Sequence, residues 1–175
     1  KIRMKTVIQT CLMIFLMTTG VVGAQKKPAG FEVAGRNFKV PAEWKAEQPS
    51  SRMRKAQYKV GEAELVVFFF GKGVGGSVEA NIGRWLGQFK EPKEKLGTKR
   101  KEQKLPGAKI TTVTAAGTFM SGPPFGAKVP KAGYAMRAAI IEFDGGPVFI
   151  KMTGPRDAVG QTADAFDKLV RSPFE

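Results

Sequence analysis

The chain has 175 residues, of which 29 are Lys or Arg and 15 are Asp or Glu, so its formal net charge is +14. It contains no His and a single Cys, Cys11, which lies in an apolar N-terminal segment. These counts exclude imidazole chemistry and, beyond that segment, disulfides, thiolate nucleophiles and thiolate metal sites. The positive balance favours anionic partners, although a highly charged surface also serves solubility.

The first 24 residues have the pattern of a secretory signal peptide. A basic start with Lys1, Arg3 and Lys5 precedes an apolar run over residues 11–17. Val22-Gly23-Ala24 fits the small-residue rule for cleavage before Gln25. The run falls short of the roughly 20 apolar residues that a spanning helix needs, so a cleaved leader is favoured over a permanent anchor. We therefore expect export to the periplasm or the extracellular space of a bacterium, with a mature charge of +11, from 26 basic and 15 acidic residues.

The rest of the chain predicts a short basic tail, residues 25–30, and one domain, residues 31–175, with no transmembrane span. About 150 residues bury enough surface for a core that has no disulfide to support it. Short alternating strands are predicted at residues 31–33 and 37–40, and residues 54–60 predict a strand with one polar face. Leu65–Phe70 is apolar on both faces, which is typical of a central, covered strand.

The second half of the chain begins with a predicted amphipathic helix over residues 78–89, with Ser77 as its N-cap. The Lys-rich residues 90–104 predict a loop and an edge strand, and residues 108–120 a long strand that bends at Gly117. A hairpin over residues 134–153 and a second helix over residues 159–170 complete the pattern. The predicted class is α+β, with a curved, mostly antiparallel sheet of about six or seven strands and two main helices.

Residues Gly71–Gly76 match the G-x-G-x-x-G pattern of dinucleotide-binding turns, between a predicted strand and a predicted helix. The rest of a dinucleotide-binding βαβ unit is missing, because the chain lacks an apolar strand that ends in an acidic residue about 20 residues after the glycines. The segment is also not a P-loop, because Ser77-Val78 stands where a P-loop has Lys-Ser or Lys-Thr. We therefore predict no cofactor and interpret the glycines as a sharp turn into the helix. A weak anion or partner contact stays open, with these candidates: Lys72, Gly73, Gly75, Gly76 and Ser77.

A second candidate surface is the Pro- and Gly-rich loop over residues 121–133, which is long for a segment without secondary structure. Its candidate contact residues are Phe125, Lys128, Lys131 and Tyr134. The alternative is a loop that covers a sheet edge with Phe125 tucked in. Trp44 and Trp85 are expected to be core anchors.

Chemistry-bearing constellations are sparse. The carboxylate pairs Glu62/Glu64 and Asp164/Asp167 are interpreted as solvated surface charges, no catalytic set is identified, and no metal site is predicted. The basic stretch 90–104 contains no aromatic residue, so it lacks the stacking element of single-strand nucleic-acid sites, and no specific nucleic acid is expected.

Two short motifs resemble the PsbP-like fold family. One is Phe38-Lys39-Val40-Pro41-Ala42-Glu43-Trp44, a strand that ends in Pro-x-x-Trp, and the other is the terminal helix Ala165–Ser172, which closes in serine. "AQYKV", "GGSVEANIGRW" and "KMTGP" also resemble small exported bacterial proteins of unknown function. The resemblance spans Phe31 to Phe174 and implies an α/β/α sandwich that serves as a protein-binding or accessory module. It implies no catalytic set.

The leading hypothesis is thus an exported, non-enzymatic binding or accessory module that contacts a protein partner through loops at one sheet edge. The alternative is a cationic protein held on an anionic envelope polymer or lipid surface, which moderate salt would release. A small-ligand carrier or an enzyme is less favoured, and a pocket with convergent polar groups beside Gly71–Gly76 would support it.

Overall fold

The computed structural model describes residues 30–123 and 125–175, so the predicted signal peptide and residues 25–29 of the predicted tail lie outside it. Gly30, predicted as the last tail residue, instead begins the first strand. The strands are β1 (Gly30–Val33), β2 (Arg36–Lys39), β3 (Lys45–Glu47), β4 (Arg54–Val60), β5 (Ala63–Phe69), β6 (Lys99–Leu105), β7 (Ala108–Ser121), β8 (Val129–Phe143) and β9 (Val148–Pro155). The helices are α1 (Val78–Leu86), α2 (Arg156–Gln161) and α3 (Ala163–Arg171), with the 3₁₀ turns η1 (Lys93–Lys95) and η2 (Ser172–Phe174).

Seven strands form one sheet in the order β3-β4-β5-β9-β8-β7-β6, and β1 and β2 form a separate hairpin. Every strand pair in the described residues is antiparallel. In particular, β5, which leads into the glycine turn, lies between β4 and β9 and runs opposite to both. The turn therefore does not belong to a parallel βαβ unit, which is the setting that a dinucleotide fingerprint requires.

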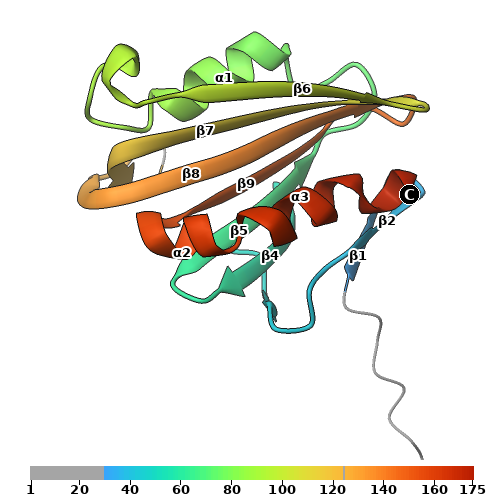
Figure 1. Cartoon of the computed structure of the whole chain (residues 1–175), viewed down its shortest axis with the longest axis horizontal. Helices are drawn as coiled ribbons and strands as arrows, with labels where there is room; N and C mark the ends of the chain where they lie inside the picture. Colours follow the sequence, from blue (N-terminus) through green and yellow to red (C-terminus); the bar gives the residue numbers. More distant parts are fainter. Residues whose placement is uncertain (1–29, 124) are drawn as a thin grey trace, which may run out of the picture.

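The elements stack in three layers, with α1 on one face of the sheet and α2 and α3 on the other (Figure 1). Alternation along the strands explains this arrangement, since successive side chains point to opposite faces. Leu65 and Val67 of β5 pack with Phe166 and Leu169 of α3, in the cluster that also holds Trp44. The other cluster joins Trp85 and the rest of the α1 stripe to β7, β8 and β9. The predicted α+β class and the sheet of seven strands are confirmed.

Two boundaries differ from the sequence prediction. The second helix is divided at Thr162, whose backbone leaves the helical region and whose hydroxyl donates to the carbonyls of Ala158 and Val159. The predicted loop over residues 121–133 is shorter in the structure, because β7 extends to Ser121, β8 begins at Val129, and the two strands pair up to these residues. We call this extension of β7 and β8 beyond Gly117 the arm.

The arm begins at a shift in register between Gly117 and Phe119, where the strand was predicted to bend. A Cβ at Gly117 would come within 2.6 Å of a Glu91 carboxylate oxygen, so a larger residue would require the Glu91 side chain to move. The same carboxylate accepts a hydrogen bond from the Thr118 amide. This bond holds the pKa of Glu91 below its ordinary value.

Candidate functional site

The sequence-predicted contact residues lie in two places, not one. Lys72, Gly73, Gly75, Gly76 and Ser77 lie between β5 and α1, beside the turn that joins β8 to β9. Phe125, Lys128 and Lys131 lie on the arm. Strand β8 separates the two groups, since its residues from Tyr134 to Phe143 alone span about 30 Å.

The glycine turn is a rigid loop. Gly71, Gly73, Gly75 and Gly76 all have positive φ angles, which favour glycine. Its last part is fixed to α1, because the Gly75 carbonyl accepts hydrogen bonds from Asn81 Nδ2 at 2.8 Å and from Arg84 Nη2 at 3.2 Å. Ser77 is the N-cap, as predicted, and its Oγ accepts from the Ala80 amide at 3.2 Å.

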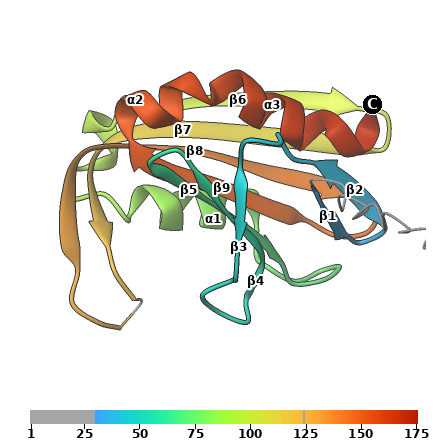
Figure 2. The same ribbon diagram turned by 90° about the horizontal axis from the view of Figure 1, so that it is seen from below.

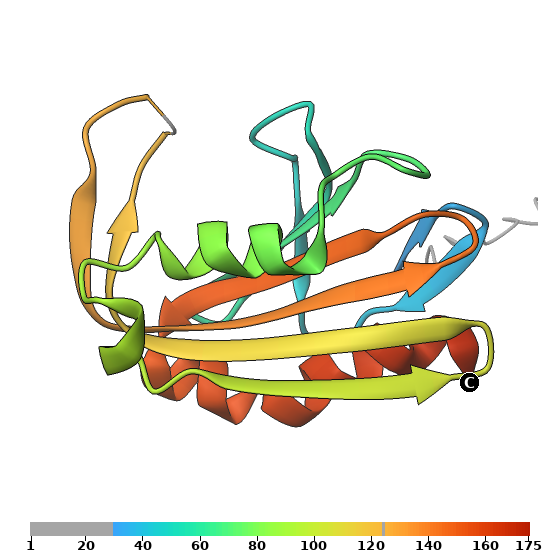
Figure 3. The same ribbon diagram turned by 90° about the horizontal axis from the view of Figure 1, so that it is seen from above.

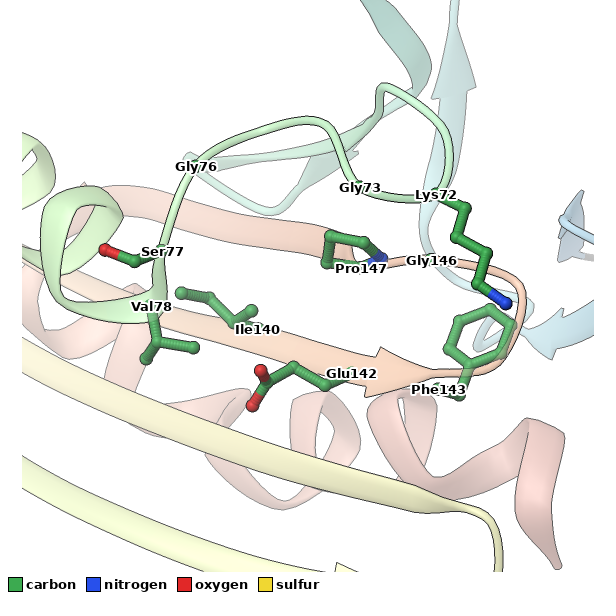
Figure 4. A pocket seen from close by; sticks show the side chains of 10 residues that line it. All are labelled: Lys72, Gly73, Gly76, Ser77, Val78, Ile140, Glu142, Phe143, Gly146 and Pro147. Atoms are coloured by element: carbon green, nitrogen blue, oxygen red, sulfur yellow. The ribbon is translucent and has the colours of Figure 1, made fainter.

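A cavity of about 240 Å³ lies between the glycine turn, the start of α1 and the end of β8. Figure 4 shows its polar groups: Lys72 comes from the turn and Glu142 from the opposite wall. Ligand sites for small molecules usually exceed roughly 300 Å³. The Glu142 carboxylate, which shares the cavity with the start of α1, would also repel a bound anion. The cavity thus fits neither a dinucleotide nor a strongly held anion.

The arm carries the second group of predicted contacts. Tyr134 lies at its base, where its ring stacks on Phe119 with centroids 6.3 Å apart. At the tip, Phe125 is fully exposed and is not tucked against the sheet. Lys128 folds back, and its ammonium donates to the carbonyls of Gly122 and Pro123. The tip therefore has a defined shape and presents Phe125 to solvent.

A third loop, between β3 and β4, was not predicted as a site. Its residue Met53 is 61% exposed. Gln57, which is buried, holds the base of this loop, since its side-chain oxygen accepts from the Ser50 amide at 3.0 Å and from Arg54 Nη1 at 2.8 Å. Its amide nitrogen donates to Glu64. A sequence signal was present, because Met53 is a large apolar side chain between two arginines in a polar segment.

All three loops project toward the same side of the molecule, away from the β6 edge of the sheet (Figures 2 and 3). We define the three-loop rim as residues 48–53, 70–77, 121–123 and 125–131. Every exposed large hydrophobic side chain of the described residues lies on this rim: Met53, Phe70, Val74, Phe125 and Val129. The rim also contains Arg52, Lys72, Lys128 and Lys131, and its sequence has no Asp or Glu.

Lys151 is a further unusual residue that the sequence analysis did not single out. It lies in the central strand β9, where its ammonium donates to Gln88 Oε1 at 2.7 Å and lies 5.7 Å from the centroid of the Phe119 ring. Burial lowers the pKa of Lys151 from 10.5 to about 8, and the nearby Arg54 charge adds to this effect. Lysines with lowered pKa values can act as nucleophiles. Lys151 lines neither of the cavities described here, and its ammonium lies over the Phe119 ring at the base of the arm.

A second basic surface lies on the far edge of the sheet. A groove of about 170 Å³ between β6 and α3 is lined by Lys99, Lys101, Arg137 and Arg171, among others. Within this groove Arg137 is paired with Asp167 by two hydrogen bonds. Elsewhere, on β4 and β5, Glu64 is paired with Arg54 at 2.9 Å. Asp167 and Glu64 keep 32% and 41% of their side chains exposed, and each has a cationic partner that the sequence analysis did not predict.

Within residues 30–123 and 125–175, no group of three metal-ligating side chains comes together. In the same part of the chain, no helix combines the length and the apolarity needed to cross a membrane.

Comparison with known proteins gives a match in structure. No family model matches the sequence, and no curated protein matches it. Among solved structures, the chain is similar to the solution structure of cyanobacterial PsbP (CyanoP) from Synechocystis, with a TM-score of 0.52 and 13% identity over 91% of this chain and 98% of that one. The chain therefore has a PsbP-like fold, as the resemblance implied. At this identity the match shows the fold alone.

The two motifs that carried the resemblance meet in the structure. The Lys39 amide donates to Ser172 Oγ at 2.9 Å, and Ser172 Oγ donates to the Leu169 carbonyl at 2.8 Å. The terminal serine thus joins the end of α3 to the β1–β2 hairpin.

Proposed function

We propose that this chain is an exported, non-enzymatic binding module that attaches to its partner through the three-loop rim. One observation carries the proposal: all the exposed large hydrophobic side chains of the described residues gather on three loops that project to one side. Loops on a rigid sheet are a common place for binding residues. Exposed apolar groups gathered on one surface mark interaction sites.

The geometry of the loops supports a binding role. Gln57 fixes the β3–β4 loop, Asn81 and Arg84 fix the glycine turn, and Lys128 closes the tip of the arm. A surface that is ordered before binding loses less conformational freedom when the partner arrives. The accessory role of a PsbP-like protein is consistent with this proposal.

The experiment is capture of the mature protein on envelope fractions of its own cell, washed at low and at moderate salt. We expect the wild type to stay bound through both washes, and the double variant Met53→Ser, Phe125→Ser to be released. Lys104→Ser, which changes an exposed position on β6, is the matched control and should bind as the wild type does. Equal retention of the double variant and the wild type would contradict the proposal.

A second candidate function is electrostatic attachment to an anionic envelope polymer through the groove between β6 and α3. The cationic lining of this groove favours this function, because its one acidic lining residue is Asp167 and its basic lining residues include Lys99, Lys101, Arg137 and Arg171. Binding of this kind weakens steeply with salt because exposed charges are screened. Equal retention of the wild type and the double variant at low salt, with release of both by the moderate-salt wash, would support this candidate instead.

A further inference from the structure

We propose that the partner of the three-loop rim is the surface of an anionic lipid bilayer. This inference rests on the proposed function, since it names the partner that the rim contacts. In this arrangement the apolar tips enter the headgroup region and the basic residues of the rim lie at the level of the lipid phosphates.

The apolar side chains have the placement that shallow insertion requires. Phe125 and Val129 lie on the arm, Phe70 and Val74 on the glycine turn, and Met53 between β3 and β4. The three loops project to the same side of the molecule, so one bilayer surface can contact all three (Figures 2 and 3). Proteins that attach to a bilayer surface place aromatic and aliphatic groups at the headgroup boundary and basic groups beside them.

The charge of the rim is complementary to an anionic leaflet. Each of the three loops carries at least one basic residue: Arg52, Lys72, and Lys128 with Lys131. The 15 acidic residues of the chain all lie outside the rim. Basic side chains close to an anionic membrane are attracted by its negative surface potential, and a carboxylate at the same depth would be repelled.

The distribution of the apolar groups favours a bilayer over a protein. A stable protein interface buries about 800 Å² on each partner, with a contiguous apolar core. The exposed apolar residues of the rim are instead divided among three separate loops, with the polar turns of each loop around them. A fluid bilayer accepts separate anchors without needing a complementary shape.

The test uses flotation of the full mature protein with vesicles of phosphatidylcholine alone, or of phosphatidylcholine with about 30% phosphatidylglycerol. We expect binding to the anionic vesicles only. The triple variant Arg52→Gln, Lys72→Gln, Lys131→Gln should bind about 100-fold more weakly, since each of the three basic residues contributes about fivefold near a membrane. The control triple Lys93→Gln, Lys95→Gln, Lys104→Gln removes the same charge from exposed positions on η1 and β6, outside both the rim and the groove, and should bind as the wild type does.

Insertion of the tip is tested separately with Phe125→Trp. The chain's own tryptophans, Trp44 and Trp85, are buried, so a blue shift on addition of anionic vesicles reports residue 125. Equal binding of the two charge triples, or binding without this shift, would overturn the inference. If no variant binds vesicles but Met53→Ser, Phe125→Ser still loses envelope capture, the partner is a protein: the proposed function then stands and the lipid inference fails. Thermal unfolding confirms that each variant is folded.

Discussion

Lys151 leads to a prediction about the pH dependence of stability. Its pKa is about 8 in the folded protein against an ordinary 10.5, so between these values the unfolded chain binds more protons at this site than the folded chain does. The free energy of unfolding must therefore rise with pH across this window. With these two pKa values, the free energy of unfolding rises by about 2 kcal/mol between pH 7 and pH 9.5. Because the side chain keeps some exposed surface, we expect about 1–2 kcal/mol.

The measurement is urea unfolding of the wild type and of Lys151→Met at both pH values. The wild type should gain this free energy relative to the variant as the pH rises, because Met cannot titrate. Lys59→Met, which replaces an exposed lysine of β4, serves as the control and should leave the pH dependence of the wild type in place. Parallel pH dependences for the wild type and Lys151→Met would refute the assignment of a buried, charged amine beneath the arm.

Three further predictions concern stability, each measured by chemical unfolding. Ser77→Ala removes the N-cap of α1 and should cost about 1 kcal/mol. Gly146→Ala should lower the free energy of unfolding by about 2 kcal/mol or more, because φ is +108° and a Cβ would lie 2.9 Å from the backbone of the glycine turn. Its control is Gly107→Ala, where φ is +74° but the space is open, and the loss should be only about 1 kcal/mol. Phe166→Ala empties a fully buried position and should cost about 3–5 kcal/mol, whereas Phe125→Ala should stay within about 0.5 kcal/mol, and the reverse order would contradict the burial described here.

Much of the fold could be predicted because local patterns determine it. The apolar run Leu65–Phe70 predicted a covered strand, and β5 is paired on both sides. The helical spacing after Ser77 predicted α1 with the correct N-cap. The hairpins on either side of the glycines correctly indicated an antiparallel sheet. These features depend on neighbours within a few residues, which the sequence contains directly.

The parts that were missed depend on contacts between distant segments. The arm has strand structure because β7 and β8 stay paired beyond the register shift at Gly117. At its base Phe89 bridges Phe119 and the Met120 amide donates to the Gln88 carbonyl, and no local sequence pattern predicts these contacts. Lys151 is the single charged residue of β9, which was a visible signal, but its lowered pKa depends on its burial and on the Arg54 charge from β4, which are not visible in the local sequence. The common direction of the three loops depends on the whole sheet.

The distribution of exposed apolar surface distinguishes between the functional classes that the sequence left open. The two cavities measure about 240 and 170 Å³, and charged side chains line both of them. The exposed large hydrophobic groups are instead at the ends of strands and on turns. Phe125 is fully exposed, whereas Phe70 also packs on Phe68 and Phe149. A contact with a partner is the proposed role of the exposed apolar side chains on the rim. The rim, with its basic residues and no acidic ones, is therefore the surface on which binding experiments should begin.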